Sequence, residues 1–353
     1  MHDYSTQKKP MTTINDVAEK ANVSIATVSY AFNKPHLVKA ETHERILAAA
    51  RELNYRPNLF ARGLAGGKSQ MIGLLVADIR YPFTATVARG IEDVLRTENY
   101  LSFISSTDGD TDETIDLLKN LHNRGVEGFI LVPSYFGVDS RLLQTLRSMS
   151  IAKIPLIVAG FQLEDDLVDA VTFRPQAATR EGVNHLIQLG HRHISYIGIH
   201  HTQGHAVARY LGYQESLLLN QIPLRPELVV ETDITPNKVR DAMATLFTLE
   251  TPPTAVFAET DIVALGVIDF CRERNIRVPE ELSLVTFDYQ TLVQRITPAF
   301  TSVVISAYEV GRTAANCFLA RQKNPDIPTQ HVALNYFFET RDTTAPPVSI
   351  SNQ

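Results

Sequence analysis

The sequence predicts a small all-α helix-turn-helix headpiece with a hinge helix, followed by an α/β core of two doubly wound parallel-sheet subdomains. Short, closely spaced helical patterns fill residues 12–53, and apolar runs alternate with helical patterns from Met71 onward. Charge divides the chain in the same way. Residues 1–68 carry ten Lys or Arg and six Asp or Glu, a net +4, whereas the whole chain carries −6 and the remainder therefore −10. A basic head on an acidic body predicts that only the head meets a polyanion.

Composition sets the remaining limits. The 353 residues are 44% hydrophobic and 20% charged, which is typical of a soluble protein of two or three domains. No apolar run reaches the ~18 residues of a membrane span, and the polar N-terminus does not resemble a secretory signal. Cys271 and Cys317 lie in apolar surroundings, so we expect buried thiols in the cytoplasm rather than a disulfide.

The headpiece is predicted from its helix ends. Thr13 is a good N-cap, and Asp16 completes a capping box. Asn22 stands where the chain must reverse, and Ser24 caps a second helix. A third helix is expected over 40–53. This spacing is that of a helix-turn-helix whose second helix can enter the major groove of DNA, although a plain three-helix bundle has the same spacing.

Two features favour DNA binding over the plain bundle. Thr27, Ser29 and Tyr30 form a polar face on the second helix, suited to base edges and phosphates. The stretch "YRPNLFARGLAGGKS", residues 55–69, then offers a short helix between a proline and a Gly-Gly pair. Its Leu64 precedes a flexible exit, so the segment is interpreted as a hinge.

The core is predicted from alternating strands and helices. Candidate strands are 71–77, 100–105, 127–132, 155–159, 194–199, 254–258 and 282–286. Candidate helices include 83–98, 111–124, 177–189, 205–220 and 260–274. Such alternation is typical of parallel sheets covered on both faces, in which ligands bind beyond the carboxyl ends of the strands. A cleft between two such subdomains is the expected small-molecule site.

No catalytic or cofactor motif is convincing, so we expect neither an enzyme nor a cofactor. "GLAGGKS" has the wrong spacing for a phosphate loop, and "DGDTDE" lacks the calcium-loop pattern. The histidine cluster has two interpretations, a metal site or structural and effector-contacting side chains, and we favour the second. The cluster consists of His191, His193, His200, His201 and His205.

Several motifs together resemble one family. "TINDVAEKANVSIATVSYAFN", "RPNLFARGLAGGKS", "IGLLVADIRYPF", "GHRHISYIG" and "VPEELSLVTFDY" are similar to segments of the LacI/GalR family of bacterial transcription repressors, in family order from about residue 12 to 345. The resemblance implies a periplasmic-binding-protein-like core and a homodimer on a palindromic operator. It also implies that the second helix reads the major groove, while paired hinge helices enter the minor groove and a leucine wedge kinks the DNA.

The resemblance assigns DNA-binding positions. Ile25 and Ala26 are implied to read bases, with Tyr30 one turn on, where many relatives have arginine. Lys39 stands where the family has a capping hydroxyl, which puts the first turn of the third helix in doubt. The other implied DNA-binding residues are Thr13, Ser24, Thr27, Ser29, Asn33, Tyr55, Asn58, Ala61, Arg62 and Leu64.

The implied effector positions are Asp78, Tyr81, Phe83, Arg174, His205, Arg209, Thr260 and Asp288. Three polar positions of sugar-binding members have changed here, to Gly160, Thr260 and Arg174. Because sugars need several fixed acceptors, these changes favour an acidic or phosphorylated sugar derivative, held by Arg209 and Asp288. A neutral sugar held in another way is the alternative.

These observations predict a ligand-responsive transcriptional regulator, a repressor of a carbohydrate or related catabolic operon, located in the cytoplasm on the nucleoid. The expected divisions are a tail at 1–11, the headpiece at 12–57, the hinge at 58–70, the effector and dimerisation core at 71–345, and a tail at 346–353. The alternative is the solute-binding protein of a transporter, which the missing export signal and the headpiece disfavour.

Overall fold

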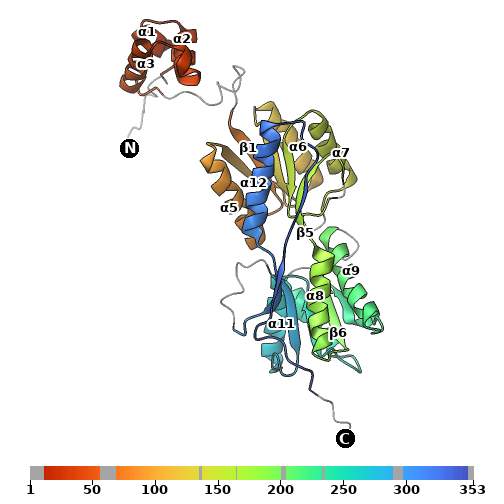
Figure 1. Cartoon of the computed structure of the whole chain (residues 1–353). Coiled ribbons are helices and arrows are strands. Elements are labelled where there is room, and N and C mark those ends of the chain that lie inside the picture. The colour runs from red at the N-terminus through yellow and green to blue at the C-terminus, as the bar shows by residue number, and fades with distance from the viewer. Residues whose placement is uncertain are drawn as a thin grey trace, which may run out of the picture. The chain divides into compact units, whose positions relative to one another are not determined.

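The structure is a computed structural model that describes residues 12–55, 69–134, 137–163, 165–199, 204–232, 235–288 and 297–348. Internal contacts divide the chain into two compact units, Met1–Ser69 and Gln70–Gln353. Each unit is described by itself. Figure 1 shows the first as a cluster of short helices and the second as two sheets flanked by helices.

The first unit is the expected three-helix headpiece. Its elements are α1 (Ile14–Lys20), α2 (Ile25–Asn33), the 3₁₀ turn η1 (Pro35–Leu37) and α3 (Ala40–Glu52). Val17, Val28 and Ile46, one from each α-helix, are fully buried and form the centre of the core. Asn22 takes the left-handed conformation, with φ at 49°, between the first two helices. The side chain of asparagine tolerates that conformation, so the tight reversal is encoded locally.

The headpiece helices begin as their sequences predict. The Thr13 hydroxyl accepts the Asp16 N–H, and the Asp16 carboxylate accepts the Thr13 N–H at 2.7 Å, which completes the capping box. The Ser24 hydroxyl caps α2 by accepting the Thr27 N–H at 3.1 Å. Lys39 begins α3 with no side-chain cap. The helix begins at Ala40 nonetheless, so the first turn that the sequence put in doubt is formed.

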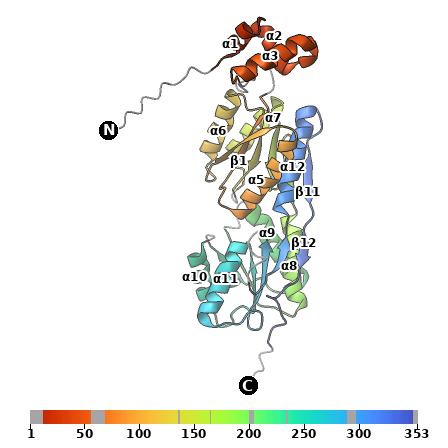
Figure 2. The same cartoon turned by 90° about the vertical axis from the view of Figure 1, so that its left-hand side faces the viewer.

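The first sheet of the second unit has the strand order β11-β5-β4-β3-β1-β2, with every pairing parallel. Its strands are β1 (Met71–Val76), β2 (Leu101–Ser106), β3 (Gly128–Val132), β4 (Leu156–Ala159), β5 (Asp169–Phe173) and β11 (His331–Leu334). Helices α5 (Pro82–Thr97) and α12 (Ala307–Lys323) pack together on one face, and α6 (Thr111–Asn123) and α7 (Ser140–Ile151) pack on the other. Figure 2 shows this layering.

Burial on both faces explains the continuous apolar runs. Along β1, Ile72 and Leu74 point into the core under α5 and α12, whereas Met71 and Leu75 point into the core under α6 and α7. A parallel strand covered on both sides therefore has no polar face to alternate with.

The second sheet has the order β12-β10-β9-β8-β6-β7, with only β12 antiparallel. Its strands are β6 (Ile194–Gly198), β7 (Val229–Glu231, after the 3₁₀ turn η2, Pro226–Leu228), β8 (Ala255–Ala258), β9 (Ser283–Asp288), β10 (Thr301–Val304) and β12 (Phe337–Glu339). Helices α8 (Pro175–Gln188) and α9 (Gly204–Leu219) form one paired layer, and α10 (Pro236–Leu246) and α11 (Asp261–Arg274) form the other. The predicted fold class is confirmed: a helical headpiece is followed in the chain by two doubly wound subdomains.

The chain crosses between the subdomains three times, from β5 to α8, from β10 to α12 and from β11 to β12. Because β5 and β10 both end where the chain crosses, the carboxyl ends of the two parallel sheets face each other at the junction. One hydrophobic core runs through it, where the rings of Phe173 and Phe287 lie 5.8 Å apart. Five of the described strands were not predicted from the sequence: β7, β11 and β12 lie at sheet edges, whereas β5 and β10 lie inside their sheets next to a crossing.

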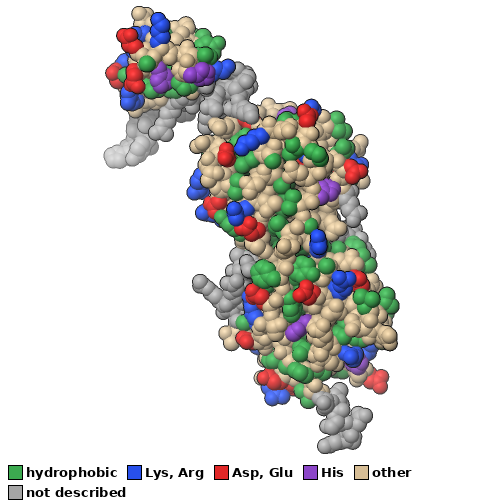
Figure 3. Space-filling view, viewed as in Figure 1, with side chains coloured by type: hydrophobic (Ala, Val, Ile, Leu, Met, Phe, Trp, Pro, Cys, Tyr) green, Lys and Arg blue, Asp and Glu red, His purple; other side chains and the backbone are tan. Residues whose placement is uncertain are grey.

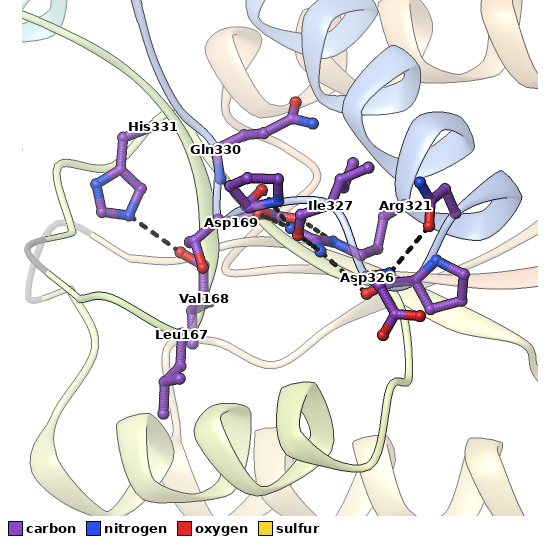
Figure 4. Close-up of polar contacts among 12 residues, drawn as sticks. Leu167, Val168, Asp169, Arg321, Asp326, Ile327, Gln330 and His331 are labelled. Atoms are coloured by element: carbon purple, nitrogen blue, oxygen red, sulfur yellow. Dashed lines mark hydrogen bonds and ion pairs between the residues drawn. The ribbon is translucent and has the colours of Figure 1, made fainter.

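The last crossing segment is anchored to the first subdomain by a cluster of polar contacts (Figure 4). The Arg321 guanidinium donates to both carboxylate oxygens of Asp169, at 2.9 and 2.7 Å. Asp169 is nearly buried, and its Oδ1 also accepts the Gln330 N–H at 2.8 Å. A second hydrogen bond joins the His331 ring to the Val168 carbonyl. These contacts hold the start of β11 beside β5, before the chain crosses to β12.

Candidate functional site

The outer surface of α2 in the headpiece exposes large side chains to solvent. Ile25 and Tyr30 are 50% and 49% exposed, although both are large and apolar or aromatic, and Ala26 is exposed beside them. Ser24 and Thr27 are tied to each other at the helix start, with their hydroxyl oxygens 2.8 Å apart. The start of α2 is therefore capped, and its solvent-facing side chains are those that the resemblance implied to read bases.

Other predicted DNA-binding residues have structural partners. Thr13 is engaged in the capping box, and the half-buried ring of Tyr55 packs 6.0 Å from the ring of Phe32. Ser29 is half-buried on α2. The remaining predicted positions lie outside the described residues or side chains: Asn33, Asn58, Ala61, Arg62 and Leu64.

In the core, the predicted effector residues of the first subdomain gather after β1. The carboxylate of Asp78 accepts hydrogen bonds from the Arg80 guanidinium and backbone N–H, which lower the pKa of Asp78. Tyr81 is half-buried, and burial raises the pKa of its hydroxyl. Phe83 lies against Gly160, which has φ at 77°. A Cβ atom at that glycine would lie 2.9 Å from the Phe83 ring, so a larger residue there would require the ring to move.

The second subdomain contributes a buried ion pair that the sequence did not predict. Arg209 on α9 and Glu259 after β8 are both 0% exposed, with Nη1 and Oε1 3.4 Å apart. The guanidinium also lies 4.4 Å from the centre of the Phe287 ring. Thr260, the next predicted effector residue, is fully buried and caps α11 by accepting the Val263 N–H. The Asp288 and His205 side chains lie outside the described parts of the chain.

Arg174 lies in a different setting from Arg209. It is exposed at the start of α8 and lines a pocket of about 430 Å³. The other walls of this pocket include Arg180 on α8, Glu215 on α9 and His331 on β11. The pocket lining contains none of Asp78, Arg209 and Thr260. Arg174 therefore lies near the ion pair of Arg180 and Glu215, in a pocket between α8 and β11.

The first histidine of the "GHRH" motif is structural. His191 is buried, and its ring nitrogens lie 2.9 Å from the Thr254 hydroxyl and 3.0 Å from the Ser283 hydroxyl. Its Nε2 is also 2.9 Å from the Ala345 carbonyl oxygen, and burial lowers the pKa of the imidazole. A neutral ring here fastens the C-terminal segment to the second sheet. His200 and His201 lie outside the described residues.

Glu259 is the residue that sequence reasoning missed, although a signal was present. A glutamate directly follows the buried apolar strand "AVFA" and stands one position before Thr260. Charged residues at the carboxyl end of a buried parallel strand point toward the ligand-binding edge of the sheet. The partner of Glu259 is 50 positions away in the chain, so only the fold reveals the pair.

A helix-turn-helix headpiece on a two-sheet core whose carboxyl ends meet defines a class of ligand-responsive DNA-binding regulators. Comparison with known protein families supports this class. Residues 13–58 match the family described as bacterial regulatory proteins, lacI family, and residues 183–344 match the periplasmic binding protein-like domain. Catabolite control protein A of Priestia megaterium is 32% identical over 334 residues, which are 94% of this chain and 99% of that protein. The chain belongs to the lacI family of bacterial regulatory proteins.

Two solved structures extend the comparison. The lac repressor dimer bound to operator and the anti-inducer ONPF matches with a TM-score of 0.83 and 25% identity, covering 95% of this chain and 99% of that one. A lacI-family regulator from Enterococcus faecium with bound ribose matches with a TM-score of 0.69 and 28% identity, covering 78% and 99%. Among the described residues of our chain, no helix has both the length and the apolar character that a bilayer crossing requires.

Proposed function

We propose that this protein represses a carbohydrate or related catabolic operon by binding a palindromic operator as a homodimer and changing its affinity when a small sugar-like effector binds. The observation that carries the proposal is α2, a helix fixed at its start by Ser24 and presenting exposed Ile25, Ala26 and Tyr30. A short helix with solvent-facing side chains at its first turns is what major-groove reading requires.

The proposed divisions follow those expected from the sequence, with the headpiece at 12–57, the hinge at 58–70 and the core at 71–345. In the hinge, Asn58, Ala61, Arg62 and Leu64 are proposed to meet the minor groove. The protein acts in the cytoplasm on the nucleoid and does not catalyse a reaction, in keeping with its membership of a family of regulators.

Dimerisation has support from the edge of the first sheet. β2 is an edge strand, and its Leu101, Phe103 and Ile104 are 53%, 38% and 43% exposed. Exposed apolar side chains on a strand that is paired on one side only are a liability for a monomer, and a second copy of the chain would cover them. A protein of the same fold is a dimer in its operator complex.

The effector is proposed to bind where the carboxyl ends of the two sheets meet. Asp78, Tyr81 and Phe83 would contact it from the first subdomain, and Arg209, Thr260 and Asp288 from the second, with His205 at the start of α9. Ribose is the ligand of one relative of similar fold, which supports a sugar here. Arg174 is proposed as an outlying contact only, because the pocket it lines contains none of Asp78, Arg209 and Thr260.

Replacing Tyr30 with arginine tests the recognition helix. Tyr30 is half-exposed on α2, and arginine can donate two hydrogen bonds to a guanine, worth about 1–3 kcal/mol of discrimination. We expect the Tyr30→Arg protein to prefer guanine at one position in each half-site when operator sequences are selected from a random pool. An unchanged consensus would show that Tyr30 packs or touches phosphate without reading bases.

Replacing Leu64 with alanine tests the proposed hinge. Loss of an apolar wedge should weaken specific operator binding by a few kcal/mol, because the kinked duplex is no longer stabilised. Affinity for random DNA, which depends on phosphate contacts, should stay the same. Titration of operator and random duplexes at one salt concentration separates the two affinities. An equal fall in both would contradict a minor-groove role.

A further inference from the structure

The pocket between α8 and β11 has walls from both subdomains. Thr172 on β5 and Ala333 on β11 are paired in register, so their side chains lie on the same face of the sheet and form one wall. The start of α8 forms the other wall, which includes Ala177 and Arg180. Two wall positions are alanines, and their small side chains leave room in a pocket of about 430 Å³. That volume is typical of sites for small ligands.

Most charged side chains around this pocket already have partners. The Arg180 guanidinium donates to the Glu215 carboxylate at 2.7 Å, and the Gln176 amide donates to the same carboxylate at 3.2 Å. The His331 ring donates its Nε2–H to the Val168 carbonyl at 3.2 Å (Figure 4). Because Arg180 and Glu215 balance each other, their pair adds no net charge to the pocket.

Arg174 is the exception among the charged side chains of the lining. Within the described part of the chain, its guanidinium has no ion pair and no hydrogen bond, although it borders the pocket. Arg174 also directly precedes α8, and a positive charge at the amino end of a helix is unfavourable unless an anion lies nearby. The apolar part of the lining consists of Leu163, Phe173, Pro175, Ala177 and Ala333.

We propose that this pocket is a second ligand site, which binds a small organic anion through a phosphate or carboxylate group on Arg174 and an apolar body on the apolar lining. Arginine donates two parallel hydrogen bonds to such a group, and hydrogen bonds to an ionised acceptor are about twice as strong as those between neutral groups. The apolar body is stabilised by leaving water. An anion without an apolar body, or a neutral aromatic compound, satisfies only half of the site.

This site lies apart from the proposed effector residues. Its lining contains none of Asp78, Arg209 and Thr260. It gives Arg174, which is at most an outlying contact of the effector, a ligand of its own. The walls belong to the core alone, so binding can be measured on the full chain without DNA and does not depend on the proposed function.

Calorimetric titration of the full chain with phenyl phosphate tests the proposal directly. Wild-type protein should bind phenyl phosphate about tenfold more tightly than inorganic phosphate, because burial of the ring adds to the binding energy. Benzyl alcohol, which has the ring without the charge, should not compete. Benzoate, titrated in parallel, identifies whether the site prefers a carboxylate or a phosphate group, and binding of either anion supports the proposal.

Three variants separate the charge of the site from its shape. Arg174→Gln removes the unpaired cation and should weaken phenyl phosphate binding by about tenfold or more, the effect of losing hydrogen bonds to a charged group. Ala333→Leu keeps every charge but fills part of the pocket from an exposed position, and should also weaken binding. Glu215→Gln removes the carboxylate that pairs with Arg180, so a second cation can meet the ligand, and affinity should rise by about threefold.

Arg124→Gln is the matched control, because Arg124 is an exposed arginine after α6 that does not line the pocket. Its affinity for phenyl phosphate should equal that of the wild type. Failure of the wild type to bind either anion would overturn the proposal. Equal affinities in the wild type, Arg174→Gln and Ala333→Leu would also overturn it, because the anion would then bind elsewhere.

Circular dichroism shows whether each variant folds, and either Arg174→Gln or Ala333→Leu decides the question if the other does not. These outcomes are separate from those that test DNA binding. A protein that selects no operator would refute the proposed function, yet its titrations with phenyl phosphate would still report on this pocket.

Discussion

Arg209→Ala is expected to lower the free energy of unfolding of the core by about 3–5 kcal/mol, because it leaves the buried Glu259 carboxylate without its counter-charge. The sequence analysis assigned Arg209 only to the effector site, as a contact of the ligand. The structure makes Arg209 a supporting residue of the fold as well as a candidate ligand contact. Urea unfolding, followed by circular dichroism, measures the effect.

The double variant Arg209→Met, Glu259→Met is the control for this prediction, and it should regain most of the stability that Arg209→Ala loses. The double variant removes both charges of the Arg209–Glu259 pair together, and its Met side chains can pack against Phe287 and the neighbouring core. If Arg209→Ala is as stable as wild type, the pair is not buried in solution. If Arg209→Ala keeps wild-type stability and loses the ligand response, Arg209 contacts the ligand. If Arg209→Ala is destabilised, loss of the response does not identify such a contact.

Asp169→Ala is expected to cost about 3 kcal/mol, measured in the same way. Arg321 would keep its carbonyl contacts to the segment before β11 but lose both carboxylate hydrogen bonds in a site where its side chain is only 14% exposed (Figure 4). The Gln330 N–H would lose its acceptor as well. The start of β11 should then detach from β5 more readily than the rest of the sheet, which amide hydrogen exchange can detect.

Lys153→Ala provides the comparison for Asp169→Ala, because Lys153 pairs with Asp326, on the segment between Arg321 and β11, but both side chains are mostly exposed. Such a surface pair contributes about 0–1 kcal/mol. Similar losses in the two variants would show that the Asp169–Arg321 pair is also an ordinary surface contact and does not anchor the crossing.

The headpiece could be predicted closely because its signals are local. Thr13, Asn22 and Ser24 specify where helices begin and where the chain reverses, and each acts within three or four residues. The alternation of strands and helices in the core could also be predicted, because strands buried on two faces have continuous apolar runs.

The three crossings between the subdomains could not be predicted from local patterns, nor could the strands β5, β10, β11 and β12 beside them. β11 is half-exposed at a sheet edge, so its pattern differs little from that of a loop. Whether α12 covers the first or the second sheet depends on contacts between distant segments. The same holds for the effector site, where Glu259 and Arg209 lie 50 positions apart and Arg174 lines a pocket with β11.

Charge on the surface adds little to the prediction of a ligand or partner for the core. In the view of Figure 3, acidic and basic side chains are interspersed over the second unit, and most of the ion pairs described there are exposed. The net charge of −10 on residues 69–353 repels DNA from this unit. The acidic side chains that carry it are spread over the surface in this view. Recognition of DNA therefore depends on the headpiece.

Selection of DNA sequences by the full chain from a random pool, at fixed salt, tests the central claim most directly. A dimer that reads the major groove with α2 should enrich a two-fold symmetric sequence and bind it at least a thousandfold more tightly than random DNA. Tyr30→Arg should change that sequence at symmetric positions. Enrichment of no sequence, or of one without two-fold symmetry, would contradict the account of this protein as a dimeric operator-binding regulator.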